Sequence, residues 1–168
     1  MEGRLIVLRF SQALRAHRGR LLSGEEAGTP VHAGTFVRKR EIVLETELLY
    51  RPAELRRILA HELFHFVWRR LSNGARRAFE SLLDAEMRRR NSGELGWSSE
   101  WRKLALTLLD RRRRTRRWRE YVCESFCDTA AWVYGGGRRQ AEVTLAAEFR
   151  AIRREWFRRR GAERAFSI

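Results

Sequence analysis

Two histidines and a glutamate stand close together in the segment ILAHELFHFVW, residues 58–68. His61 and His65 are four residues apart, so on a helix both imidazoles lie on one face and can reach the same metal ion. Glu62 projects beside them, where a carboxylate can take a proton from a zinc-bound water. The neighbouring residues are mostly apolar, and burying three ionisable side chains among them requires compensation. The spacing therefore predicts a metal site, with Zn²⁺ as the expected ion and Glu62 as the expected catalytic base.

A catalytic zinc site needs a third protein ligand and one open position for water. The remaining histidines, His17 and His32, both precede the motif, and the chain has only three aspartates. A downstream glutamate is therefore the expected third ligand. Glu120 and Glu124 are both candidates, because they lie one helical turn apart in EYVCESFCDTAAWVYGGG, a stretch without lysine or arginine. A metal ion would compensate carboxylates that have no cation nearby.

The same stretch contains the two cysteines of the chain, Cys123 and Cys127. Their spacing on one expected helix rarely forms a structural disulfide, so a reducing cytoplasm is the expected compartment. As metal ligands they would compete with Glu124, which the same helix presents between them. We therefore interpret the two thiols as buried structural groups, with a redox role as the alternative.

The sequences HELFH (61–65) and ESFCD (124–128) together resemble the gluzincin peptidases, whose pattern is H-E-x-x-H followed by E-x-x-x-D. The ImmA/IrrE-like metallopeptidases look closest, and the catalytic domains of HtpX-like peptidases share a similar second motif. The resemblance covers about residues 35–134. It implies a zincin-like fold, a protein or peptide substrate, and zinc ligation by His61, His65 and Glu124, with Asp128 hydrogen-bonded to a ligating histidine. About 58 residues separate the two motifs, which keeps Glu120 open as the alternative ligand.

The resemblance also implies how a substrate would be handled. The strand around Ile42–Glu45 would lie along the cleft and pair with an extended substrate by strand addition. Tyr121, Tyr134, His32 and several arginines are candidates for stabilising the oxyanion. The loop 91–99 is a candidate cover over the cleft.

The elements that must position these residues are expected to form one α+β domain over residues 1–168. Its first part, 1–50, reads as a small strand-rich region, and residues 51–160 read as a bundle of about five helices that carries the HExxH helix. The expected strands are 4–10 and a hairpin or single strand over 35–45, with a helix over 11–22 and an irregular stretch over 23–34 between them. The expected helices run from Pro52 to Asn73–Gly74, over 75–90, from about Glu100 to the arginine block, from about Thr115 to 134, and through 145–156.

The chain carries a net charge of +15, and all of its 36 basic residues except Lys39 and Lys103 are arginine. Such a charge suits a nucleic acid or an acidic protein as partner, and it is also what a GC-rich genome produces. The alternative function is therefore a zinc-stabilised, proteolytically inactive module that binds nucleic acid through its arginines. The first ten residues do not read as a signal peptide, and no apolar run is long enough to span a bilayer, so no membrane partner is expected.

Overall fold

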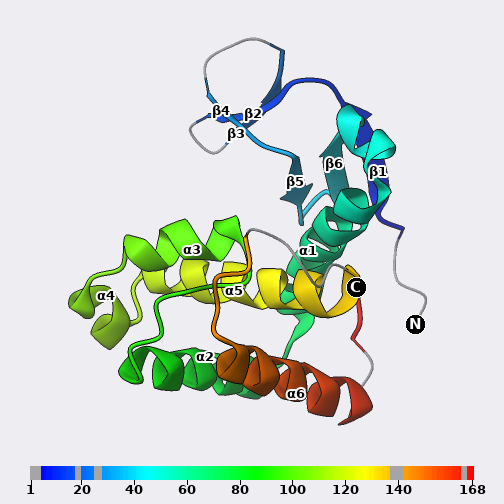
Figure 1. Ribbon diagram of the computed structural model, residues 1–168. Helices are drawn as coiled ribbons and strands as arrows, with labels where there is room; N and C mark the ends of the chain where they lie inside the picture. The colour runs from blue at the N-terminus through cyan, green and yellow to red at the C-terminus, as the bar shows by residue number, and fades with distance from the viewer. Residues whose placement is uncertain (1–4, 18–19, 25–27, 137–141, 164–165) are drawn as a thin grey trace.

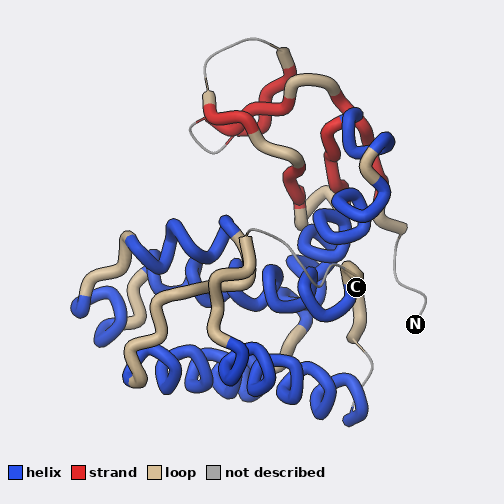
Figure 2. Tube along the Cα trace, in the orientation of Figure 1, coloured by secondary structure: helices blue, strands red, loops and turns tan. Residues whose placement is uncertain are grey.

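Strands and helices occupy separate parts of the molecule. The computed structural model describes residues 5–17, 20–24, 28–136, 142–163 and 166–168. The described residues form an α+β fold in which two small sheets are followed by six α-helices. The strands gather at one end and most of the helices at the other, and α1 runs between the two groups (Figures 1 and 2). The predicted order, strands first and helices after, is confirmed.

The sheet nearest to α1 has the strand order β1-β6-β5. β1 (Val7–Ser11) runs parallel to β6 (Glu41–Glu45), and β5 (Ala33–Phe36) pairs antiparallel with β6, so the hairpin is the correct one of the two alternatives predicted for 35–45. Ile42 and Leu44 of β6 are fully buried and alternate with half-buried residues, as expected for a strand that packs one face on a core. They pack in one cluster with Ile58 and Phe66 of α1, so this sheet supports the helix that carries the histidines.

The second sheet corrects a sequence prediction. The segment 11–22 was expected to be helical, but it contains β2 (Leu14–His17) and the start of β3 (Arg20–Ser23), which pair antiparallel; β2 also pairs with β4 (Thr29–Pro30). Tertiary contacts override the local helical spacing here. The backbone N–H groups of Ala13 and Leu14 donate to the carboxylate of Glu45, at 2.9 and 2.7 Å, and Ala13 has a positive φ of 49°, which ends any helix at that residue.

In the helical part, successive helices are joined mostly by short segments. After a 3₁₀ turn, η1 (Thr46–Tyr50), the helices are α1 (Pro52–Arg70), α2 (Asn73–Arg88), α3 (Trp97–Leu104), α4 (Leu108–Arg113), α5 (Arg116–Tyr134) and α6 (Ala147–Glu163). Asn73 and Gly74 were expected to end α1, but they begin α2, because the Ser72 side chain accepts a hydrogen bond from the N–H of Ala75 and caps that helix.

The helix expected from Glu100 to the arginine block is two helices, α3 and α4. Thr107 and Asp110 form a capping box, in which each side chain accepts a hydrogen bond from the other residue's backbone N–H. This arrangement satisfies the first N–H groups of a new helix and therefore favours a break before it. None of the described helices is long and apolar enough to cross a membrane.

α5 is the central helix of this part. It lies between α3 on one side and α2 and α6 on the other (Figure 1). Phe126 of α5 is fully buried and packs against the rings of Phe79 from α2 and Phe157 from α6, with centroid distances of 5.4 and 5.0 Å. α5 also makes its most extensive helix contact with α1. The two helices that carry the HExxH and ExxxD motifs therefore face each other.

Candidate metal centre

The packing of α1 on α5 brings the predicted ligands together. Nε2 of His61 lies 3.3 Å from Oε2 of Glu124. The ring centroids of His61 and His65 are 5.0 Å apart, with the rings edge to face. His61 is buried, and the side chain of Glu124 is only 16% exposed. One member of a histidine pair on α1 thus meets a shielded carboxylate from α5.

Asp128 holds His61 from the opposite side of its ring. Nδ1 of His61 lies 2.8 Å from Oδ1 of Asp128. The other carboxylate oxygen, Oδ2, accepts hydrogen bonds from the backbone N–H and the hydroxyl of Ser99, at 2.9 and 2.7 Å. A Cβ atom added at Gly96 would lie 2.5 to 2.7 Å from the Asp128 carboxylate, so the chain leading into α3 needs glycine to approach this closely. Ser99 and Gly96 were not predicted from the sequence.

A buried ion network lies behind this contact. Arg153 of α6 is fully buried, and its guanidinium lies 2.6 Å from Oε2 of Glu86 and 2.8 Å from Oε2 of Glu94. Glu94 also accepts a hydrogen bond from Tyr121, at 2.6 Å, and its Oε2 lies 3.4 Å from the hydroxyl oxygen of Ser99. Ser99 therefore connects the carboxylate beside His61 with a network that spans three helices. Tyr121, a sequence candidate for the oxyanion, is buried in this network.

Glu62 is held by the sheet. Its Oε2 accepts a hydrogen bond of 2.5 Å from the hydroxyl of Thr35 in β5, and the same hydroxyl lies 3.2 Å from the Glu62 carbonyl oxygen. The hairpin predicted from the sequence thus contributes directly to the site. Thr35 itself was missed, because it lies 27 residues from Glu62 and no local pattern marks their contact.

The two cysteines lie against His65. Nδ1 of His65 is 3.7 Å from Sγ of Cys123 and 3.5 Å from Sγ of Cys127. Cys127 is buried and Cys123 is partly exposed, and both thiols are free. In the part of the chain that the structure describes, His61, His65 and Cys127 form a group whose ligand atoms all lie within 4.8 Å of one another, so these three could hold a metal ion. The geometry therefore gives the thiols a place at the site that the sequence did not predict.

Neighbouring charges shift the pKa values of His61 and Glu124 in favour of their ionised forms. Burial alone would lower the pKa of His61, but the carboxylate of Asp128 and the hydrogen bonds to Asp128 and Glu124 raise it well above its usual value. Burial would likewise raise the pKa of Glu124, but the hydrogen bond from His61, together with the charges of His65, His61 and Arg102, lowers it to about 2. Arg102 of α3 approaches Oε1 of Glu124 at 3.5 Å. The carboxylate is thus ionised and ready to meet a cation.

The alternative ligand lies elsewhere. Glu120 is exposed, and its Oε1 accepts a hydrogen bond of 2.6 Å from Arg116 on the same helix. Among the other sequence candidates, Tyr134 packs on Phe64 and Phe166 at centroid distances of 5.4 and 6.4 Å. The structure thus brings Glu124, but not Glu120, to His61.

A cleft of about 440 Å³ opens beside His61 and Glu62. Residues 29–33 line one wall, α3 lines another with Trp97 and Trp101, and the ion pair of Arg57 with Glu142 adds a charged edge. Of the predicted oxyanion candidates, His32 lines this cleft. The strand expected to pair with substrate, 42–45, cannot do so, because β6 is the central strand and both of its edges are already paired. β5 is the strand that lies beside the cleft and at the edge of the sheet.

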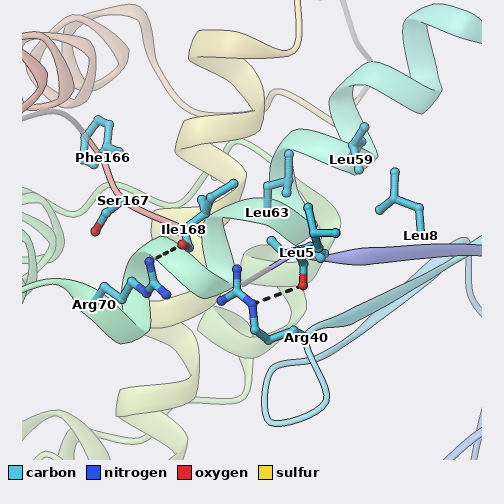
Figure 3. A pocket seen from close by; sticks show the side chains of 10 residues that line it. Leu5, Leu8, Arg40, Leu59, Leu63, Arg70, Phe166, Ser167 and Ile168 are labelled. Carbon is cyan, nitrogen blue, oxygen red and sulfur yellow. Dashed lines mark hydrogen bonds between the residues drawn. The ribbon is translucent and has the colours of Figure 1, made fainter. Parts of the chain in front are cut away.

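A second groove lies on the other side of α1 (Figure 3). Leu59 and Leu63 point into it, and helical periodicity places them opposite His61 and His65. Arg70 donates a hydrogen bond to the carbonyl of Ile168 there, and Arg40 donates one to the carbonyl of Leu5. The described residues that line this groove include no histidine, cysteine or carboxylate, so it offers no metal ligands comparable with those of the first site.

Comparison with known protein families, curated proteins and solved structures finds no match to this chain.

Proposed function

We propose that this chain is a zinc-dependent metallopeptidase of the gluzincin type with a zincin-like fold. The observation that carries the proposal is the meeting of two helices: α1 presents His61, Glu62 and His65, and α5 presents Glu124 to Nε2 of His61. The cleft beside Glu62 provides room for a substrate.

The separation of one pair of donor atoms agrees with a zinc site. In a tetrahedral site, nitrogen and oxygen ligands about 2.0–2.2 Å from the ion are about 3.4 Å from each other. The 3.3 Å between Nε2 of His61 and Oε2 of Glu124 agrees with this ligand-to-ligand distance. In the proposal, His61, His65 and Glu124 hold the ion, and Asp128 accepts the Nδ1 proton of His61 so that Nε2 is the ligating atom. When bound, zinc supplies Lewis acidity, which makes water acidic near neutral pH and polarises a carbonyl group.

Glu62 is the proposed general base. Thr35 donates to Oε2 and fixes the orientation of the carboxylate, so Oε1 takes the proton from the attacking water. Glu62 then returns this proton to the departing amine. An extended peptide would lie in the cleft between β5 and α3, with its backbone along the outer edge of β5 and an apolar side chain against Trp97 or Trp101.

The alternative, a proteolytically inactive module that binds nucleic acid, rests on net charge. Several arginines already have carboxylate partners within the chain, including Arg57, Arg111 and Arg153. This alternative also gives no role to a buried glutamate placed between two histidines. We therefore prefer the peptidase.

The test is metal content followed by hydrolysis. Purified wild type, Glu62→Gln, His65→Ala, Glu124→Ala and Glu120→Ala are reconstituted with zinc, dialysed and analysed by plasma mass spectrometry. We expect Glu124→Ala and His65→Ala to hold at least one zinc per chain fewer than the wild type, and Glu62→Gln and Glu120→Ala to hold as much zinc as the wild type. A peptide library read by mass spectrometry should then be cleaved by the wild type but not by Glu62→Gln. Absence of zinc in the wild type, or cleavage by Glu62→Gln, would overturn the proposal.

A further inference from the structure

We propose that Cys123, Cys127 and Nδ1 of His65 form a thiol-rich position for a thiophilic metal ion. This position adjoins the one formed by His61 and Glu124 and shares His65 with it. It goes beyond the proposed peptidase activity, since it concerns a different set of donor atoms and requires no hydrolysis.

The distances agree with ligation by both thiols. Sulfur and imidazole nitrogen bind zinc at about 2.3 Å and about 2.0–2.1 Å, so in a tetrahedral site they lie about 3.6 Å from each other. The two measured separations from Nδ1 of His65 are 3.5 Å to Cys127 and 3.7 Å to Cys123. Each sulfur is therefore spaced from Nδ1 of His65 as two ligands of one ion would be.

A fourth donor lies within reach. The ligand atoms of His61, His65 and Cys127 are all within 4.8 Å of one another. His61 can therefore complete the coordination of an ion that approaches from the thiol side. An imidazole also has two nitrogens that can each bind a metal, so His65 can serve the thiol position through Nδ1 and the His61–Glu124 position through Nε2.

The surroundings favour a soft, positively charged ligand. Cys127 is fully buried, while Cys123 is partly exposed and gives an ion a way in. The stretch 120–137 contains no lysine or arginine that would neutralise a pair of thiolates from their own helix. Thiolates select Zn²⁺, Cu⁺ and similar ions over Mg²⁺ and Ca²⁺. The chemical class of the ligand is therefore a thiophilic metal ion.

Cobalt(II) added to the full chain under a phosphine reductant tests this inference. Cobalt bound by thiolate shows an intense charge-transfer band in the near ultraviolet, whereas cobalt bound only by imidazole and carboxylate does not. We expect the band in the wild type and in Glu124→Gln. It should fall to background in Cys123→Ser/Cys127→Ser, while that double variant still binds cobalt at His61 and Glu124.

Three outcomes separate this inference from the proposed function. Cobalt binding in the wild type without a charge-transfer band would overturn the thiol position and leave the peptidase proposal intact. A band that survives in Glu124→Gln, combined with no zinc lost in Glu124→Ala, would support the thiol position and contradict the peptidase ligand set. A band that persists in the double variant would show that the thiols are not its source and would overturn the inference.

Serine at the fully buried position 127 could disturb folding, so Cys123→Ser alone is measured as well. Cys123 is partly exposed, and its replacement should leave the far-ultraviolet circular dichroism unchanged. The band should then weaken, because one of two thiolate donors is lost. An unchanged band in this folded variant would exclude Cys123 from the position and overturn the inference as stated.

Discussion

Nδ1 of His61 lies 2.8 Å from Oδ1 of Asp128, and both side chains are buried. This contact determines which nitrogen of the imidazole is available, because Nδ1 donates its proton to the carboxylate and Nε2 then faces Glu124. Ser99 holds the second oxygen of Asp128 through two hydrogen bonds, so the carboxylate cannot rotate freely. The orientation of a candidate ligand on α1 is thus controlled from α5 and α3 together.

Replacement of Asp128 by asparagine should weaken zinc binding by about 10- to 100-fold, because the carboxylate that orients His61 becomes a neutral amide. Competition with a chromophoric chelator measures the affinity. Asp110→Asn is the matched control, since Asp110 caps α4 and contacts Thr107 and Thr115 rather than the histidines. Equal zinc affinities for wild type and Asp128→Asn would contradict the role of Asp128.

Gly96→Ala should displace the Asp128 carboxylate. Like Asp128→Asn, it should therefore reduce the zinc affinity, by about tenfold or more. The added methyl would stand 2.5 to 2.7 Å from carboxylate atoms. The backbone at Gly96 is extended, with φ of −174°, so strain at this residue is not the cause. Gly74→Ala is the control, because its Cβ would meet only the Ser72 hydroxyl at 3.9 Å. The same chelator competition applies, and a zinc affinity equal to that of Gly74→Ala would count against the close approach.

Thr35→Val should retain zinc and lower the rate of peptide cleavage by about 10- to 100-fold, because Glu62 loses the hydroxyl that orients it. The measurement is the turnover number on the best peptide from the library, with zinc content determined on the same sample. Thr115→Val removes a hydroxyl that contacts Asp110 instead and should cleave at the wild-type rate. If Thr35→Val cleaves as fast as Thr115→Val, Glu62 does not depend on this contact.

Glu94→Gln should destabilise the fold by about 3 to 5 kcal/mol at pH 7, because Arg153 would lose one partner of a buried ion pair. Burial opposes ionisation of Glu94, but the charge of Arg153 and its hydrogen bond outweigh burial and lower the pKa from 4.5 to about 2. The folded pKa lies below the ordinary value, so this contribution is complete above about pH 4.5 and is lost as the pH falls towards 2.

Urea unfolding of wild type and Glu94→Gln at several pH values measures this difference. Other carboxylates titrate in both proteins, so the difference between the two isolates Glu94. The gap in unfolding free energy should narrow steadily below pH 4.5. A gap that stays constant down to pH 3 would show that the ionised form of Glu94 is not what stabilises the fold.

The local patterns of the sequence predicted the parts of the fold that depend on neighbouring residues. The hairpin over 35–45, the helix beginning at Pro52 and the helix ending before the glycines at 135 follow from alternation, a proline at the first turn and helical spacing. The helix predicted over 11–22 was wrong because strand pairing and the carboxylate of Glu45 act there from a distance. Local spacing cannot report such a contact.

The same distinction applies to the site. His61, Glu62 and His65 are recognisable by spacing alone, and Glu124 and Asp128 by a second motif on one helix. Ser99 and the thiol contacts of His65 were not recognised, since each joins residues from different helices and no local pattern marks the pairing. Arg153 was also not recognised, because one arginine among many carries no distinguishing pattern. It is fully buried between two glutamates rather than exposed to solvent.

The two halves of the candidate site come from helices that lie far apart along the chain, α1 ending at Arg70 and α5 beginning at Arg116. During synthesis, the N-terminal part emerges first, and His61 and His65 then have no carboxylate or thiol from α5 to meet. The complete set of donors exists only once the chain has been made past Cys127 and α5 has packed on α1, across an intervening segment that contains α2, α3 and α4. In the proposal, metal capture therefore follows the synthesis of α5, and we expect a chain truncated before α5 to bind zinc more weakly than the complete chain.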